Sequence, residues 1–302
     1  MNLAIAHQSG EIAPVTISEL DITAYAKKTT ISRRSDLNVW ARWCRDNGRE
    51  PWPIETTTLI EFINAQGEIK KLATVRRYLS TLSWLLTSQG VENIAKSQIV
   101  IKTLKALAIK IGSAQKQAVP LTPEIVGGLA HDTNSLIGLR NAALLAVQFD
   151  LLARKSEIVN LDVECVSFLY NGGASILIRR SKTDQTGQGR LLAIRPAAAD
   201  LLKKWLKRAE IKSGAVFRAI DKYGNISPKR LSMAGFDYII KNAAGKEFSG
   251  HSARVGMAQQ LLRHKFSIAE IMNLGRWKSA EMVARYTANI AVTQSPIFRL
   301  PD

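Results

Sequence analysis

The sequence predicts a mainly α-helical fold in two domains: an all-helical first half, and a mainly helical second half that carries a small β-sheet. Three observations support this prediction. Apolar residues recur at helical spacing through most of the 302 residues. Residues 112–124 read GSAQKQAVPLTPE, a linker-like composition. Residues 174–194 contain two β-rich runs around a Gly-containing turn. We therefore expect domains at residues 1–115 and 116–302, the second ending in a short C-terminal tail.

Four or five short helices are predicted between residues 17 and 111. The first, TTISRRSDLNVWARWCRDNG, opens with capping Thr and Ser and places apolar side chains on one side. The second follows the prolines of EPWPIETTTLIEFINAQ. The third, LATVRRYLSTLSWLLTSQG, ends at Gly90, and the fourth lies in SQIVIKTLKALAIKIG. The inward-facing residues of this small bundle should be Leu37, Trp40, Ala41, Cys44, Val75, Tyr78, Leu79, Leu82, Leu85 and Leu86.

The second half changes its periodicity along the chain. LIGLRNAALLAVQFDLLARKSEIVNL, residues 136–161, predicts a long buried helix, a break and a second helix. ASILIRRSKTDQTGQGRLLAI, residues 174–194, predicts a β-hairpin. Helical patterns resume at residue 197 and are expected to continue nearly to the end of the chain.

Charge points to a polyanionic partner. The chain has 42 Lys and Arg against 25 Asp and Glu, a net charge of +17 and a pI near 10.0. Two cysteines, Cys44 and Cys165, are too few for a disulfide framework and favour a reduced, intracellular setting. No signal peptide is apparent, and no apolar run reaches the roughly 20 residues that span a bilayer. We therefore expect a cytoplasmic protein that binds nucleic acid.

The stretch FSGHSARVGMAQQLL, residues 248–262, places His251 and Arg254 three residues apart at the start of an apolar segment. On a helix they would share one face near its N-terminus, where backbone N–H groups already favour anions. This arrangement suits a phosphate. Arg154 lies in another apolar run, where an unpaired charge would be costly, and Glu157 at i+3 is a suitable partner to hold it.

Four stretches carry a resemblance to a known family: LLARKSEIVNL, RRSKTDQTGQGR, SGHSARVGMA and IMNLGRWKSAEMVARYTAN. They resemble the catalytic boxes of the tyrosine recombinases, also called the phage integrase family, and most closely its Cre-type members. The order Arg, Lys, His-x-x-Arg, Trp, Tyr is highly specific. The resemblance covers the second half of the chain, and the helical first half fits the core-binding domain of the family more loosely. It assigns catalytic roles to Arg154, Lys182, His251, Arg254, Trp277 and Tyr286, with Glu157 in support.

These residue types suit phosphodiester cleavage by a tyrosine. Arg154 and Arg254 present planar forks of donors to oxygens that gain negative charge. His251 donates to the same phosphate or shuttles a proton, and the indole N–H of Trp277 can donate to it. Tyr286 has an ordinary pKa near 10, so it needs the cationic pocket or a base to react as a nucleophile. By resemblance, Lys182 protonates the leaving 5′-oxygen.

The resemblance implies a site-specific DNA recombinase that forms a 3′-phosphotyrosyl intermediate. It further implies a homotetramer on two inverted-repeat sites of double-stranded DNA, strand exchange through a Holliday junction, and a bacterial, plasmid or phage origin. No cofactor or metal is expected, because the sequence has no G-x-x-x-x-G-K-[ST] loop and no carboxylate cluster for Mg²⁺. Two alternatives stay open: a type IB topoisomerase-like relaxase, and a DNA-binding or architectural protein without catalysis.

Basic residues of the first half are the predicted DNA contacts. The stretch EIKKLATVRRYL is the best candidate for a helix that enters the major groove, with Thr74 among its base-reading residues. An ordinary solvated helix face would show the same pattern. The predicted DNA-binding residues are Arg33, Arg34, Lys70, Lys71, Thr74, Arg76 and Arg77.

Overall fold

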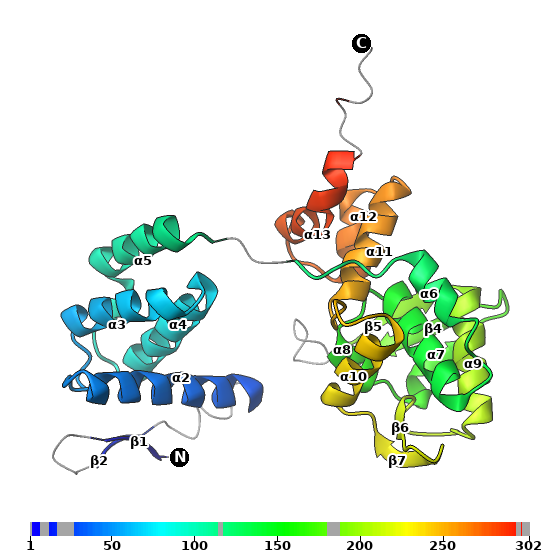
Figure 1. Ribbon diagram of the computed structural model, residues 1–302, viewed down its shortest axis with the longest axis horizontal. Coiled ribbons are helices and arrows are strands. Elements are labelled where there is room, and N and C mark those ends of the chain that lie inside the picture. The colour runs from blue at the N-terminus through cyan, green and yellow to red at the C-terminus, as the bar shows by residue number, and fades with distance from the viewer. Residues whose placement is uncertain are drawn as a thin grey trace. The chain divides into compact units, whose positions relative to one another are not determined.

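The computed structural model describes residues 2–6, 12–16, 27–113, 117–179, 188–293 and 297. Helices dominate it, which confirms the mainly α-helical fold class (Figure 1). The chain divides into two compact units, Met1–Gln115 and Lys116–Asp302. Each unit has its own apolar core. Among the helices in the described ranges, none is long and apolar enough to cross a membrane.

In its described residues, the first unit packs four helices around one core. They are α2 (Lys27–Asp46), α3 (Thr56–Ile69), α4 (Leu72–Ser88) and α5 (Gln98–Ile111), with a 3₁₀ turn, η1 (Ile94–Lys96), before α5. The predicted inward faces of the first and third helices are confirmed. Ala41 packs against the core, and the other predicted positions are buried: Leu37, Trp40, Cys44, Val75, Tyr78, Leu79, Leu82, Leu85 and Leu86.

The prediction of an all-helical first unit is wrong in one respect, because the unit also contains two strands. Two short strands, β1 (Asn2–Ala6) and β2 (Ile12–Thr16), pair antiparallel ahead of α2. Their sequences, NLAIA and IAPVT, contain Ile, Val and Thr, whose β-branched side chains favour strands. Segments of five residues are too short to show the two-residue alternation of a strand clearly, so these strands were not predicted from the sequence.

The second unit is built around the buried helix α7 (Leu136–Asp150), where twelve of fifteen residues are buried. α7 packs against α6 (Pro123–Leu129), α9 (Pro196–Arg208) and α11 (Ser252–Arg263). The predicted break after α7 is present: Leu152 has a left-handed φ of 45°, and a short second helix, α8 (Lys155–Val159), follows. The remaining helices are α10 (Met233–Ala243), α12 (Ile268–Gly275) and α13 (Ala280–Thr293).

The predicted hairpin is confirmed as two strands of a three-stranded antiparallel sheet. β4 (Ala174–Ile178) pairs with β5 (Arg190–Ile194), in a register that sets Ile178 opposite Arg190. β3 (Val166–Phe168) follows a 3₁₀ turn, η2 (Val163–Cys165), and adds to the other edge of β4. The alternate residues Ala174, Ile176 and Ile178 of β4 point into the core. Residues 180–187, which include Lys182, lie outside the described part of the chain.

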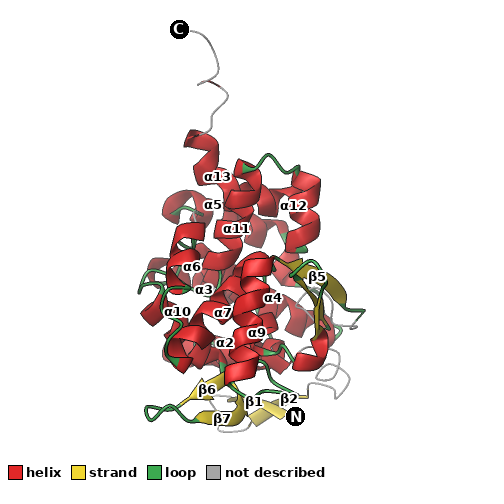
Figure 2. Ribbon diagram, turned by 90° about the vertical axis from the view of Figure 1, so that its right-hand side faces the viewer, coloured by secondary structure: helices red, strands yellow, loops and turns green. Residues whose placement is uncertain are grey.

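A second hairpin contradicts the prediction of continuous helix after residue 197. β6 (Arg218–Ile220) and β7 (Ile226–Arg230) pair antiparallel at the end of the unit away from α13 (Figure 2). The turn between them depends on local chemistry: Gly224 has a φ of 89°, and the Asp221 carboxylate accepts from the backbone N–H of Tyr223 and Asn225. These turn residues lie within a mixed apolar pattern that a search for helical periodicity overlooks.

Close backbone contact fixes the position of α11, the helix that carries Arg254. The backbone N–H of Leu121 donates to the carbonyl of Ser252 at 3.0 Å. A Cβ atom at Gly256 would lie 1.7 Å from the carbonyl oxygen of Leu121, a contact that no side-chain movement could relieve. Glycine is therefore required at position 256, because only a residue without a Cβ lets α11 approach the segment before α6 so closely.

Candidate active site

Arg154 and Glu157 form the ion pair that the sequence analysis predicted. Arg154 precedes the first turn of α8, and its Nη1 lies 2.8 Å from Oε1 of Glu157. The same carboxylate accepts the backbone N–H of Arg154 through Oε2 at 2.9 Å. Glu157 is buried, while the Arg154 side chain is 17% exposed. One carboxylate therefore fixes both the backbone and the guanidinium of Arg154 and leaves that guanidinium accessible from solution.

Arg254 lies in the interior of the second unit, only 1% exposed, on α11. Its Nη1 donates to the carbonyl of Leu152, and its Nη2 donates to the carbonyl of Gly275 at 2.9 Å. Burial lowers the pKa of Arg254 to about 10, and the charges of Arg154 and Arg276 add to the effect. The group stays protonated near pH 7. Both hydrogen-bonded acceptors are neutral, so its charge is suited to a bound anion.

Arg276 is a third arginine of this cluster, which the sequence analysis missed. Its Nη2 lies 2.6 Å from Oε2 of Glu157, and its Nη1 donates to the carbonyl of Leu151 at 3.1 Å. Burial lowers the pKa of Arg276, whereas the Glu157 carboxylate acts in the opposite direction. Its position could have indicated a role. Arg276 lies between apolar residues in LGRWKS, directly before Trp277, and a charged side chain in such surroundings needs a partner.

Trp277 joins the arginine cluster to Tyr286. The indole stacks on the Tyr286 ring, with centroids 5.1 Å apart and planes at 29°. The Arg254 guanidinium carbon lies 5.0 Å from the centroid of the same indole. Trp277 is 8% exposed and belongs to the core, and the same side chain lies beside Arg254.

Two glutamines hold the backbone of α13 at Tyr286. The side-chain N–H groups of Gln117 and Gln259 donate to the Tyr286 carbonyl at 2.9 and 3.1 Å. Gln117 comes from the segment before α6, and Gln259 comes from α11. Neither residue could be predicted from the sequence, because a glutamine that binds a distant backbone carbonyl has no characteristic spacing. Together they tie the Tyr286 turn to the segment before α6 and to α11, the helix that carries Arg254.

His251 occupies the position directly before α11, three residues before Arg254, at the helix N-terminus where the sequence placed it. It is exposed, whereas Arg254 is buried beneath the same end of the helix. The backbone N–H of His251 donates to the Ser249 hydroxyl at 3.4 Å. An exposed histidine and a buried arginine therefore lie within one turn of each other at this end of α11.

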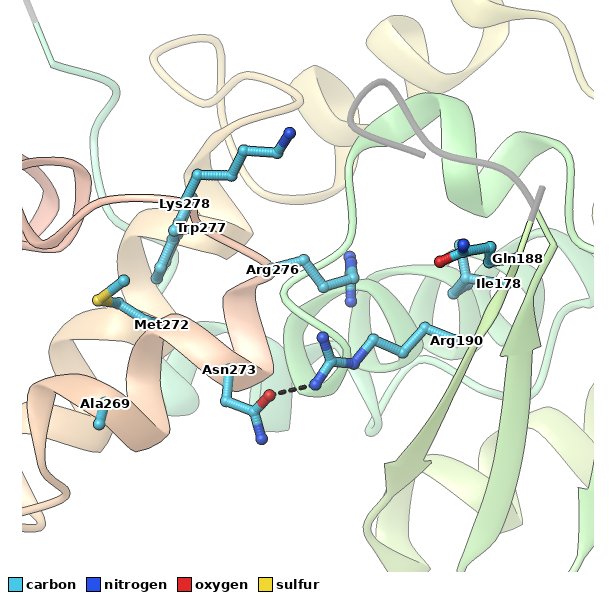
Figure 3. Close-up of a pocket in the computed structure, with 10 residues that line it drawn as sticks. Ile178, Gln188, Arg190, Ala269, Met272, Asn273, Arg276, Trp277 and Lys278 are labelled. Atoms are coloured by element: carbon cyan, nitrogen blue, oxygen red, sulfur yellow. Dashed lines mark hydrogen bonds between the residues drawn. The ribbon is translucent and has the colours of Figure 1, made fainter. Parts of the chain in front are cut away.

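A pocket of about 510 Å³ opens beside the cluster, between β5 and α12. Arg276, Trp277 and Lys278 line one side of it, and Arg190 reaches in from β5 (Figure 3). Arg190 donates to the side-chain oxygen of Asn273 on α12. The basic residues of its lining make this pocket suitable for an anionic ligand next to the arginine cluster.

The site as a whole is cationic. Arg154, Arg254 and Arg276 set three positive charges against the one carboxylate of Glu157, a formal excess of two. Such an excess stabilises a bound phosphate, and more strongly one that gains charge during a reaction. Within the described ranges, no group of three or more His, Cys, Asp or Glu side chains could hold a metal ion.

The predicted DNA-binding residues of the first unit lie on and around α2 and α4. Lys70 and Lys71 form the turn between α3 and α4, directly before the helix that carries Thr74, Arg76 and Arg77. Arg34, Lys70, Lys71, Arg76 and Arg77 are exposed.

Two of these arginines have clear partners within the first unit. Arg77 pairs with the buried Asp36 at 3.0 Å, where burial raises the Asp36 pKa. The guanidinium of Arg33 lies 4.0 Å from the centroid of the Trp84 ring. Both contacts link α2 to α4: Arg77 of α4 pairs with Asp36 of α2, and Arg33 of α2 lies over Trp84 of α4.

Comparison with known proteins places this site in a family. Residues 121–291 match the model of the phage integrase family. The chain is 31% identical to an integrase/recombinase XerD homolog of Selenomonas ruminantium, over 91% of this chain and 84% of that protein. It is 26% identical to the recombinase Cre of Escherichia phage P1, over 99% of this chain and 98% of that protein.

Solved structures agree with the fold. An integrase of transposon Tn1549, in complex with transposon right end DNA, superposes with a TM-score of 0.62 at 12% identity, over 92% of this chain and 96% of that one. The XerH site-specific recombinase, bound to a palindromic difH substrate, superposes with a TM-score of 0.58 at 22% identity, over 81% of this chain and 73% of that one. The chain therefore belongs to the phage integrase family, the tyrosine recombinases, which are enzymes that break and rejoin DNA strands.

Proposed function

We propose that this protein is a site-specific DNA recombinase whose nucleophile is Tyr286. The observation that carries the proposal is the continuous contact from Tyr286 through Trp277 to Arg254. A tyrosine hydroxyl is a weak nucleophile at neutral pH, and cations around the scissile phosphate are what allow it to react. The arginine cluster supplies such cations, with Arg254 against the indole that stacks on the tyrosine.

The proposed reaction is a transesterification at phosphorus. The Tyr286 phenolic oxygen attacks the scissile phosphate, an O–P bond to tyrosine forms, and the bond from phosphorus to the 5′-oxygen breaks. Arg154 and Arg254 bind the non-bridging oxygens, and Trp277 donates its indole N–H to one of them. His251 accepts the phenolic proton, and Lys182 donates a proton to the departing oxygen.

The intermediate is a 3′-phosphotyrosyl ester that conserves the energy of the broken linkage. A 5′-hydroxyl from a second DNA strand then attacks this ester and releases Tyr286, so the exchange needs no ATP. We propose that Arg33, Arg34, Lys70, Lys71, Thr74, Arg76 and Arg77 of the first unit hold the DNA, with residues 1–115 as its core-binding domain. The second unit, residues 116–302, is the proposed catalytic domain.

We further propose that the enzyme acts as a homotetramer on two double-stranded sites with inverted repeats, through a Holliday junction. The palindromic substrate in the XerH complex supports symmetric sites, since two-fold sites match paired protomers. Such DNA lies in the cytoplasm of a bacterium, carried on a chromosome, plasmid or phage, and that is where we expect the enzyme to act.

A plasmid assay tests this function. A duplex is first enriched from a randomised pool by binding to the protein, and two copies are cloned in direct orientation into a supercoiled plasmid. Recombination should produce two smaller circles, identified by restriction digestion, and a plasmid without sites should stay supercoiled. Relaxation of the site-free plasmid would contradict the proposal in favour of a topoisomerase-like relaxase. Binding without any change of the DNA strands would contradict it in favour of an architectural protein.

A further inference from the structure

Arg276 has a backbone conformation that is unfavourable for its residue type. It ends α12 with φ 55° and ψ 46°, the left-handed region. Glycine or asparagine commonly occupies such a position, because a side chain with a Cβ costs about 1–2 kcal/mol there. A long charged residue in this place is a reason to ask what its side chain does.

The side chain of Arg276 is only 6% exposed and ties three parts of the second unit together. It donates to the carbonyls of Leu151 and Leu274 at 3.1 and 3.4 Å, and to Glu157 at 2.6 Å. Leu151 lies just before the break that precedes Arg154, and Glu157 lies on α8. Arg276 thus connects the end of α12 to both sides of the segment that carries Arg154.

Glu157 is shared between two arginines in a particular way. Its Oε1 accepts from Nη1 of Arg154 at 2.8 Å, and its Oε2 accepts from Nη2 of Arg276 at 2.6 Å. A lone carboxylate would favour a two-pronged pair that engages two N–H groups of Arg154. Oε2 also accepts the backbone N–H of Arg154 at 2.9 Å, so with Arg276 it already has two donors, and the guanidinium of Arg154 meets Glu157 through Nη1 on Oε1. The rest of its fork is then oriented by this single contact.

The Leu152 carbonyl connects Arg276 to the other proposed phosphate ligand. It accepts from Nη1 of Arg254 and, at 3.5 Å, from Nη2 of Arg276. Leu152 is itself left-handed, with a φ of 45°, which turns the chain between α7 and α8. Arg276 therefore shares one acceptor with each of the arginines assigned to the phosphate: Glu157 with Arg154, and the Leu152 carbonyl with Arg254.

We propose that Arg276 is a positioning residue for phosphate binding: it holds Glu157 so that Arg154 keeps its donor fork toward the scissile phosphate. The proposal rests on the recombinase function above. Without Arg276, Oε2 of Glu157 keeps the backbone N–H of Arg154 but gains a vacant acceptor position, which draws a second N–H of the Arg154 guanidinium toward the carboxylate. The site also loses one of its positive charges. DNA binding through the many other basic residues is retained, and the chemical step slows.

The test measures single-turnover covalent capture of a nicked duplex, made from the DNA that the wild-type protein enriches from a randomised pool. Arg276→Gln should slow capture about 10- to 100-fold, the range expected when a reacting group is misplaced by about 1 Å. The dissociation constant for the same DNA should change less than about 3-fold, since many phosphate contacts remain.

A double variant distinguishes positioning from mere packing. If Arg276 acts through Glu157, then Glu157→Gln/Arg276→Gln should capture DNA no more slowly than Glu157→Gln alone. Arg230→Gln is a matched control. Arg230 also pairs with a carboxylate, Asp162 at 2.5 Å, and donates to the carbonyls of Leu161 and of Val159, which ends α8 at the opposite end from Arg154. This control should keep the wild-type capture rate.

Three results would overturn the inference: wild-type capture by Arg276→Gln, losses that multiply in the double variant, or an equal loss in Arg230→Gln. Thermal unfolding followed by circular dichroism checks each variant. Arg276→Asn, which tolerates the left-handed backbone, serves if the Gln variant does not fold. Failure of both to fold would make Arg276 a core residue and also contradict the proposal. If the wild type itself captures no DNA, it is the recombinase function that fails.

Discussion

The indole of Trp277 stacks on the ring of Tyr286, with centroids 5.1 Å apart and an angle of 29° between the planes. The Arg254 guanidinium lies beside the same indole, 5.0 Å from its centroid. One aromatic side chain thus sets the distance between the proposed nucleophile and a proposed phosphate ligand. Trp277 is packed into the core, so the side chain that contacts both Tyr286 and Arg254 is held in place.

Replacement of Trp277 should therefore affect the chemical step. Trp277→Leu removes the stacking surface but keeps an apolar side chain, and we expect single-turnover cleavage to slow about 10- to 100-fold. Trp277→Phe keeps a ring against Tyr286, and its cleavage rate should fall clearly less than that of Trp277→Leu. Equal rates for the Leu variant and the wild type, with both folded by circular dichroism, would show that the stack does not position Tyr286.

Removal of the Arg254 guanidinium should slow cleavage strongly without abolishing DNA binding. Arg254→Gln takes away a charge aimed at developing negative charge on the phosphate, a loss of about 100- to 1,000-fold in rate for a donor of this kind. Affinity for DNA, measured by fluorescence anisotropy, should fall only modestly and should still weaken steeply with salt. Near-normal cleavage by this variant would contradict the phosphate clamp.

Arg254→Gln also needs a check on stability, because the side chain is buried and binds two carbonyls. Arg140→Gln offers a comparison, since Arg140 is also buried, donates to the Arg218 carbonyl and lies outside the cluster. Burial lowers the pKa of Arg140 to about 10, as it does for Arg254. We expect a similar loss of stability in both variants, and a loss of cleavage in Arg254→Gln alone.

Gly256→Ala should destabilise the second unit. The added methyl group would meet the Leu121 carbonyl oxygen at 1.7 Å, and overpacking of this kind costs about 1–3 kcal/mol or more. We expect the melting temperature to fall by about 2–4 °C for each kcal/mol. Gly128→Ala in α6 is the control, because nothing lies within 4 Å of its Cβ position. An unchanged melting temperature for Gly256→Ala would contradict this packing of α11.

The sequence revealed those parts of the fold and site whose signal is local. The faces of α2 and α4 follow from helical spacing, and the Arg154–Glu157 pair follows from their i, i+3 positions in an apolar run. The pairing of β4 with β5 follows from two β-rich runs around a turn. In each case the neighbours along the chain carry the information.

What the sequence did not reveal depends on contacts between distant segments or on single turns. The Arg276–Glu157 pair joins residues 119 positions apart and has no spacing rule. The same holds for Gln117, which reaches Tyr286 across 169 positions. The β6–β7 hairpin depends on the Asp221 and Gly224 turn, whose signal lies in two residues only. Such features follow from tertiary packing, which overrides local propensity.

The central claim is that Tyr286 forms the covalent bond to DNA, and Tyr286→Phe tests it most directly. This change removes only the hydroxyl and keeps the ring that stacks on Trp277. Wild-type protein should yield a complex with a nicked duplex that survives denaturing gel electrophoresis, with the DNA attached to the peptide that contains Tyr286. Tyr286→Phe should bind the same duplex with similar affinity and yield no such complex. A covalent complex formed by the Phe variant, or attachment to another residue, would contradict the account.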